Sequence, residues 1–418
     1  MYQKSVLPNG IVLVTETIPY VKSISLGAWI KAGSRFETIE NQGISHFMEH
    51  MMFKGTKKRS AKEIAETIDS VGGQINAFTA KEHTCYYLKM VDSHLALAVD
   101  VLSDMLLRAD FSETDIAKER EVVKEEIHMY EDTPDELVHD LHMERVWPEH
   151  TLGRKILGTL QTVDAFDQEK LRAYYDAYYR PENIVIAAAG NLTHEALKTM
   201  LEESLCLSPT VTHETGRCPA PLFQNGTSFH EKAIEQTHIC LSTPGLPQGS
   251  PEIYTLHILN NILGGGISSR LFQTIREEMG LAYSVYSYQT NYSDAGLFGI
   301  YAGTRPENGQ EVLRVIKATL EELRTNGISK SELLKAKEQL KGNLLLGLES
   351  SSSRMSRLGK LEIIMGKYVT LEEVVNKIDA VTCESLQKMI NGLFCAGQIC
   401  LTVLGPQREG VTYEFTGF

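Results

Sequence analysis

The sequence predicts an α+β fold built from two homologous halves. A chain of 418 residues exceeds what one hydrophobic core usually supports, which favours two or three domains. The chain also resembles itself at an offset of about 215 residues. Within each half, strand patterns come first and helix patterns follow, an order typical of α+β layers and not of alternating βα units.

Two kinds of strand recur in both halves. An alternating strand that leads to a long helix is expected at residues 23–30 and again at 237–244. A continuously apolar strand that ends in glycine is expected at 183–190 and again at 398–405. The two strands of the first half and their counterparts in the second half are separated by nearly the same number of residues, so the repeat covers a whole half of the chain.

The junction between the halves is rich in proline and glycine. These residues interrupt helices and strands, so we expect a linker at 211–225. The predicted domains are therefore 1–210 and 226–418.

Composition limits the possible partners and locations. The chain is 42% hydrophobic and 23% charged, as in a well-packed soluble protein, and its net charge of -13 argues against nucleic acid as a partner. No apolar leader opens it and no run is apolar enough for membrane insertion. Seven cysteines without C-x-x-C spacing indicate reduced thiols. We therefore expect a cytoplasmic protein.

The most informative motif is His46-Phe47-Met48-Glu49-His50. Residues 44–53 read as a short helix, on which His46 and His50 share one face and Glu49 projects beside them. Two imidazoles can hold zinc, while a carboxylate outside the ligand set can take a proton from a zinc-bound water. The order H-x-x-E-H is the inverzincin signature, although such a histidine pair also occurs by chance on amphipathic helices.

A third zinc ligand is expected from the predicted helix at 112–130, which is rich in glutamate. On a helical wheel, Glu119 and Glu126 lie about 40 and 60 degrees from the apolar Val123. An unpaired carboxylate so close to a core face is costly, so both need a partner. A metal is one explanation, and a salt bridge to Arg120 or Lys124 is the other.

The runs 43–56 and 119–126 resemble the pitrilysin-like zinc metallopeptidases, and within them the bacterial relatives of the mitochondrial processing peptidase beta subunit. The resemblance implies that each half is a mostly antiparallel sheet with helices on one face, and that the halves close like a clamshell around a chamber. It places the third metal ligand on Glu126 and a supporting second-layer carboxylate on Glu119.

The resemblance also covers residues beyond the metal motif. It makes residues 74–79, which include Asn76, Ala77, Phe78 and Thr79, a substrate-binding edge strand, and an ordinary hairpin is the alternative. It matches Arg276 and Tyr283 to the family's arginine-tyrosine pair, which would bind a peptide carbonyl and the developing oxyanion. A structural role, in a helix ending at Gly280 and in the next strand, is the alternative.

Together these features predict a zinc-dependent endopeptidase in which Glu49 is the general base. The substrate would be a peptide or an unfolded polypeptide, and the resemblance implies a homodimer. The alternatives are a non-catalytic partner subunit of a processing-peptidase-like complex and a zinc hydrolase of small amides. Four other histidines have no matching carboxylate pattern and are expected at the surface: His83, His128, His139 and His142.

Overall fold

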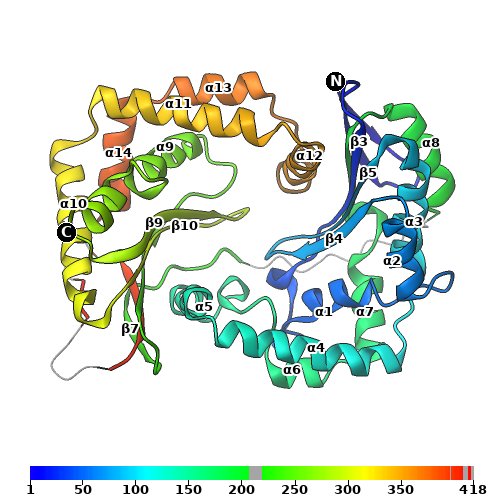
Figure 1. Ribbon diagram of the computed structural model, residues 1–418, viewed down its shortest axis with the longest axis horizontal. Helices are drawn as coiled ribbons and strands as arrows, with labels where there is room; N and C mark the ends of the chain where they lie inside the picture. The colour runs from blue at the N-terminus through cyan, green and yellow to red at the C-terminus, as the bar shows by residue number, and fades with distance from the viewer. Residues whose placement is uncertain (207–218, 396, 408–412, 416–418) are drawn as a thin grey trace. The chain divides into compact units, whose positions relative to one another are not determined.

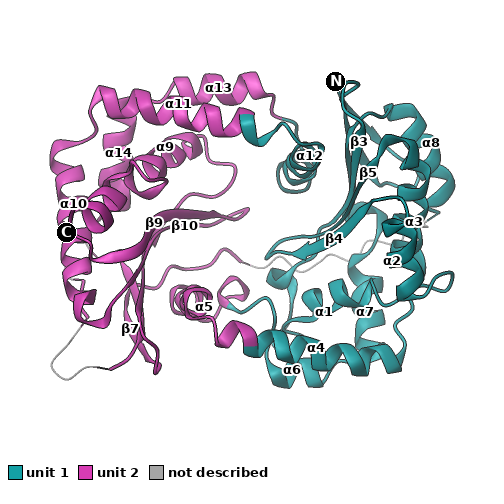
Figure 2. Cartoon of the chain, in the orientation of Figure 1, with its two compact units in different colours: residues 1–128, 154–218, 346–368 teal, residues 129–153, 219–345, 369–418 magenta. Residues whose placement is uncertain are grey.

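The computed structural model describes residues 1–206, 219–395, 397–407 and 413–415. The chain forms two compact units (Figure 2), and neither is continuous in sequence. Unit 1 consists of residues 1–128, 154–218 and 346–368, and unit 2 of residues 129–153, 219–345 and 369–418.

Unit 1 contains a six-stranded sheet with the order β1-β2-β6-β3-β5-β4 (Figure 1). Its strands are β1 (Tyr2–Val6), β2 (Val12–Thr17), β3 (Ser23–Ile30), β4 (Gln74–Thr79), β5 (Thr84–Val91) and β6 (Ile184–Gly190). All neighbouring strands are antiparallel except β2 and β6, which run parallel. The sheet is thus mostly antiparallel, as predicted, and β4 lies at its edge.

Both faces of the central strands β3 and β6 are buried, which explains the continuously apolar sequence of β6. The alternating residues of β3 are also buried on both faces. On β3, Ile24, Leu26 and Ala28 join the main core, whereas Trp29 joins a smaller core on the opposite face. The helices of unit 1 are α1 (Ile44–Met51), α2 (Ala61–Asp69), α3 (Leu95–Arg108), α4 (Glu113–Glu131, whose last residues fall in unit 2), α6 (Leu160–Asp164), α7 (Gln168–Tyr178), α8 (His194–Ser204) and α12 (Ser351–Met365).

Unit 2 repeats this topology without the first strand. Its sheet has the order β7-β11-β8-β10-β9, and again one neighbouring pair, β11 and β7, is parallel. The strands are β7 (Gly226–Glu231), β8 (Thr237–Pro244), β9 (Ala282–Asn291), β10 (Gly296–Thr304) and β11 (Cys400–Gly405). The equivalence of β3 with β8 and of β6 with β11 confirms the internal repeat.

The helices of unit 2 also follow the repeat. They are α5 (Pro134–Val146), α9 (Ile253–Gly264), α10 (Gly309–Asn326), α11 (Lys330–Gly347, whose last residues fall in unit 1), α13 (Leu371–Asp379) and α14 (Cys383–Leu393). Helix α9 follows β8 as α1 follows β3. At the spacing of His46, Glu49 and His50, it offers His257, Asn260 and Asn261 in their place.

Each half contributes one helix to the sheet of the other half. Helix α12, from the second half of the chain, packs on β3, β6 and β2 of unit 1. A Cβ on its Gly359 would lie 2.1 Å from Nε1 of Trp29, so glycine is what allows this close approach. Helix α5, from the first half, packs on β8 and β11 of unit 2. The prediction placed helices on one face of each sheet. The exchanged helices α12 and α5 also pack on their sheets, so that the second face of each sheet is covered as well.

The predicted domains 1–210 and 226–418 describe the sequence repeat, while the compact units cut across them through this exchange. Most of the predicted linker, up to residue 218, lies outside the described residues. Every described helix is too short or too polar to cross a lipid bilayer. Six cysteines are described and all are free thiols; the seventh, Cys218, lies outside the described residues.

Candidate metal centre

Helix α1 carries the predicted motif and is held at its N-terminus by a buried carboxylate. The two oxygens of Glu37 accept hydrogen bonds from the backbone N–H groups of Gly43, at 2.8 Å, and Ser45, at 2.9 Å. Gly43 has a positive φ of 92°, which favours glycine. Burial raises the pKa of Glu37, while these hydrogen bonds oppose the rise. Glu37 is not predictable from the sequence as a helix cap, because its distance from α1 matches no local capping pattern.

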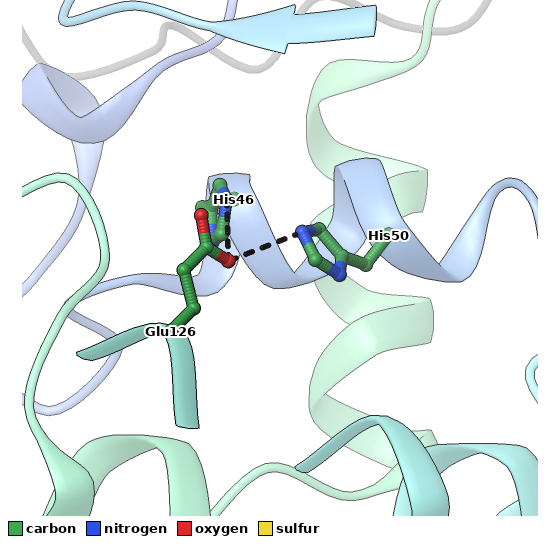
Figure 3. Close-up of side chains that lie close together, drawn as sticks. All are labelled: His46, His50 and Glu126. Carbon is green, nitrogen blue, oxygen red and sulfur yellow. Dashed lines mark ion pairs between the residues drawn. The ribbon is translucent and has the colours of Figure 1, made fainter. Parts of the chain in front are cut away.

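Three predicted ligands converge at one point in unit 1 (Figure 3). Oε2 of Glu126 lies 3.6 Å from Nε2 of His46 and 3.5 Å from Nε2 of His50. The two imidazoles come from successive turns of α1, and Glu126 comes from α4. Among the described residues, this is the group of histidine, cysteine and acidic side chains whose ligand atoms could share a metal ion.

The separations fit a tetrahedral metal better than direct hydrogen bonds. Ligands at about 2.0–2.1 Å from a tetrahedral zinc lie about 3.4 Å apart, close to the 3.6 and 3.5 Å that separate Oε2 of Glu126 from the two imidazoles. A hydrogen bond between nitrogen and a carboxylate oxygen is shorter, about 2.7–2.9 Å. Two imidazoles and one carboxylate are also a donor set that zinc accepts in catalytic sites. The residues therefore fit a zinc ion.

The surroundings of His46 keep its imidazole neutral, so that a nitrogen lone pair is available to bind a metal. Burial lowers the pKa of His46 to about 3, and the neighbouring His50 contributes in the same direction. Its Nδ1 atom is buried and has no hydrogen-bond partner among the described residues. Burial raises the pKa of Glu126, against the opposing influence of His50. A cation at this point would offset the cost of burying that carboxylate.

Behind the ligands, Glu119 fixes the orientation of His50. Its Oε1 lies 2.7 Å from Nδ1 of His50, and its Oε2 lies 2.5 Å from Nζ of Lys54. The Glu119 side chain is buried, and these two partners overcome the effect of burial and lower its pKa. Burial alone would lower the pKa of His50, but Glu119 and Glu126 outweigh it and raise that pKa. The ion pair considered from sequence is made by Lys54 and not by Arg120 or Lys124.

Glu49, the predicted base, lies on α1 beside this group and contacts the edge strand. Oε2 of Glu49 accepts a hydrogen bond from the hydroxyl of Thr79 at 2.5 Å. Burial raises the pKa of Glu49, while the Thr79 hydrogen bond and the His50 charge oppose this rise. The structure thus brings Glu49 and Thr79 together with the three ligands in unit 1.

The predicted substrate strand is present as β4, which spans the predicted 74–79. Asn76 and Phe78 lie on its exposed side, whereas Ala77 and Thr79 lie on the half-buried side. Oδ1 of Asn76 accepts the backbone N–H of Ala77 at 2.8 Å. The strand ends the order of its sheet, so its second edge is unpaired by the described strands.

Arg276 and Tyr283 lie together in unit 2. The Arg276 guanidinium lies 4.7 Å from the ring centre of Tyr283 and 4.8 Å from that of Phe272. Both residues line a cavity of about 390 Å³ that also includes Arg305. Arg276 lies on a π-helix, Phe272–Glu278, where the sequence predicted an ordinary helix. Such π-helical turns are rare and concentrate at functional sites.

The prediction of four surface histidines is wrong for two of them. His83 and His142 are buried, His139 is half-buried, and His128 is exposed. His142 bonds to two hydroxyl groups beneath α5, and His83 packs against Trp29. For His142, two hydroxyl groups satisfy the nitrogens of a neutral imidazole, and no local sequence pattern reveals those distant partners. Nδ1 of His83 has no hydrogen-bond partner among the described residues, and burial lowers the pKa of His83 to about 4.

Comparisons with known proteins define the family. Residues 12–160 match the insulinase family, peptidase family M16, and residues 165–340 match the peptidase M16 inactive domain. Relatives named zinc proteases cover nearly all of the chain, so the family assignment does not depend on either domain match alone. The chain belongs to peptidase family M16, which confirms the predicted pitrilysin-like membership.

Curated relatives extend over nearly the whole chain. A protein of Bacillus subtilis named uncharacterized zinc protease YmxG is 46% identical, over 94% of this chain and 96% of its own length. The uncharacterized zinc protease SCO5738 of Streptomyces coelicolor is 39% identical, over 97% and 90%. The names of both relatives include the predicted cofactor, zinc.

Two solved structures share the fold. A protease from Helicobacter pylori has a TM-score of 0.90 and 22% identity, covering 97% of this chain and 99% of its own. A peptidase M16 inactive domain from Pseudomonas fluorescens has a TM-score of 0.90 and 20% identity, covering 99% and 100%. The predicted α+β class is therefore confirmed.

Proposed function

We propose that this protein is a zinc-dependent endopeptidase that hydrolyses peptides or extended protein segments. His46, His50 and Glu126 hold the metal, and Glu49 is the general base. The observation that carries the proposal is the convergence of three ligand atoms within 4.8 Å of one another, on the helix face beside Glu49. The names of the zinc protease relatives support the same activity.

A zinc ion in this site would acidify a water molecule toward pKa ~7 and polarise the scissile carbonyl. Glu49 takes the proton of the attacking water and delivers it to the leaving amine. Glu119 holds the imidazole of His50 in one orientation and one tautomer, because its carboxylate accepts the hydrogen bond from Nδ1. Nε2 then faces Glu126 with its lone pair free for the metal. Lys54 in turn holds Glu119.

Substrate binding is assigned to two places. The unpaired edge of β4 adds a peptide backbone as a further strand, with Asn76, Ala77, Phe78 and Thr79 in register. From unit 2, Arg276 binds a peptide carbonyl and Tyr283 donates to the oxyanion that forms during water attack. The exposed side chain of Tyr283 supports this role, because its hydroxyl is open to a ligand.

The test compares Glu49→Gln with wild type on internally quenched peptides, with and without a chelator. We expect Glu49→Gln to retain zinc and to cleave at least about a hundredfold more slowly, the order that removal of a general base costs. Glu125→Gln, an exposed change on α4, is the matched control and should remain active. Turnover by Glu49→Gln near the wild-type rate would remove the proposed mechanism. A wild type that never cleaves, even with zinc, would favour a non-catalytic partner subunit.

The homodimer and the cytoplasmic location stay predictions. If the active site is built across a dimer interface, a mixture of Arg276→Ala and Glu49→Gln chains should recover activity. A mixed dimer has an intact Glu49 on one chain and an intact Arg276 on the other. These two residues meet in one active site only if each site takes residues from both chains. Verified mixed dimers without activity would instead indicate that each chain completes its own site.

A further inference from the structure

One feature of β4 has no role in peptide binding through the backbone: the side chain of Thr79. It lies on the half-buried side of the strand, and its hydroxyl donates to Oε2 of Glu49. Among the described residues, no other side chain donates a hydrogen bond to Glu49. Within the described part of the chain, Glu49 therefore has one fixed oxygen and one oxygen without a donor.

The position of Thr79 is itself rigid. Thr79 is the last residue of β4 and pairs with Thr84 of β5 across the hairpin. The turn is closed by a hydrogen bond from Ala80 N–H to the His83 carbonyl at 2.8 Å. It is tied to the neighbouring loop by Arg35, whose backbone N–H donates to Lys81 O at 2.7 Å and whose guanidinium pairs with Glu82 at 2.7 Å.

The residue type suits this task. A glutamate has several rotatable bonds, so a carboxylate on a helix surface samples many orientations unless a partner fixes it. Threonine is β-branched and stiff at χ1, and a strand favours it, so its hydroxyl is aimed before any ligand arrives. Proton transfer requires such fixed geometry, because small displacements of the base are costly in rate.

We propose that Thr79 is a positioning residue for Glu49, holding one carboxylate oxygen from the end of β4 so that the other receives the proton. This inference rests on the proposed function. It assigns the side chain of Thr79 to the base and leaves the backbone of β4 to the substrate. It also links the two, because a peptide that adds to β4 further orders the strand that holds the base.

The experiment uses full-length protein and four variants: Thr79→Val, Thr79→Ser, Thr84→Val and Glu49→Gln. Valine keeps the shape of threonine but removes the hydroxyl, and serine restores the hydroxyl. Thr84→Val is the matched control, since the Thr84 hydroxyl donates to the Ala32 carbonyl and does not contact Glu49. For each variant we measure zinc content, kcat and KM on a quenched peptide. We also measure the affinity of the zinc-free protein for a labelled peptide by fluorescence anisotropy.

We expect Thr79→Val to lose about tenfold or more in kcat, the order expected for one hydrogen bond to a charged group. Its zinc content, KM and zinc-free peptide affinity should stay within about twofold of wild type. Thr79→Ser should recover most of kcat, and Thr84→Val should keep it. A merely structural threonine would not separate kcat from KM or depend on the hydroxyl in this way.

Two outcomes would overturn the inference while Glu49→Gln remains inactive. Thr79→Val could keep its kcat, with or without weaker peptide binding, or Thr79→Ser could be no better than Thr79→Val. An active Glu49→Gln variant would instead show that the proposed function itself is wrong, so the two failures are distinguishable.

Discussion

The buried His142 should lower the free energy of unfolding of unit 2 in mild acid. The side chain lies on α5 with both nitrogens engaged, Nδ1 2.9 Å from Oγ1 of Thr402 and Nε2 2.7 Å from Oγ of Ser242. It is fully buried, and burial lowers its pKa to about 3. The imidazole is therefore neutral in the folded protein at pH values where an unfolded chain already binds a proton.

The sign and size of the effect follow from this difference. An unfolded histidine titrates near pH ~6.5, so between about pH 6.5 and pH 3 the unfolded state binds one more proton than the folded state. Stability is then fully present above pH ~6.5 and is lost as the pH falls. At pH 5, about 1.5 units below the unfolded pKa, the loss is about 2 kcal/mol at ~1.36 kcal/mol per unit.

The assay isolates this proton with His142→Gln, whose amide can bond to both hydroxyl groups but does not titrate. Trp147, which follows α5, reports unfolding of unit 2 by its fluorescence once Trp29 is replaced by phenylalanine. Urea unfolding at pH 7.5 and pH 5 should show that His142→Gln loses about 2 kcal/mol less than the parent. His128→Gln, an exposed change, should behave like the parent. Equal losses in His142→Gln and the parent would refute the reasoning.

Three further changes test the metal site and the packing. Glu126→Gln should contain far less zinc than wild type whereas Glu125→Gln keeps it, measured by elemental analysis, and the reverse result would show that the ligand is misassigned. Lys54→Met should weaken zinc binding about tenfold in a chelator competition, because it removes the cation that pairs with Glu119 behind His50. An unchanged zinc affinity would show that this ion pair does not support the metal site. Gly359→Ala should destabilise unit 1 by about 1–3 kcal/mol in thermal or urea unfolding, since its Cβ would overlap an indole ring. The matched change Gly342→Ala, in a helix with nothing within 4 Å, should be neutral or stabilising, and equal effects of the two would contradict the packing argument.

The helical wheel of α4 separated four glutamates correctly. Glu119 is buried and Glu126 half-buried, whereas Glu121 and Glu125 are exposed. The wheel succeeded because α4 is long and regular, so that the rotation between residues places each side chain relative to the buried Val123. The edge strand β4 was expected from the family resemblance and not from a pattern in the residues, and in the structure its exposed and half-buried residues alternate.

The exchange of α5 and α12 was not predictable in this way. An apolar stripe shows that a helix packs on something, but it does not identify the sheet that receives it. Gly359 is a case in point, because glycine in a helix interior is unfavourable when the helix is considered alone. The reason for this glycine is the ring of Trp29, which comes from a strand more than three hundred residues earlier in the chain.

The same limit applies to α1, the helix at the centre of the proposed chemistry. Helix α1 has only eight residues, too few to be stable by itself, so its place depends on contacts from other elements. Glu37 binds its N-terminus, Glu119 on α4 binds His50, and Thr79 on β4 binds Glu49. The motif in α1 therefore shows which chemistry is available, whereas residues on three other segments determine its geometry. A variant that alters one of these contacts should change turnover or metal binding while leaving the H-x-x-E-H motif intact.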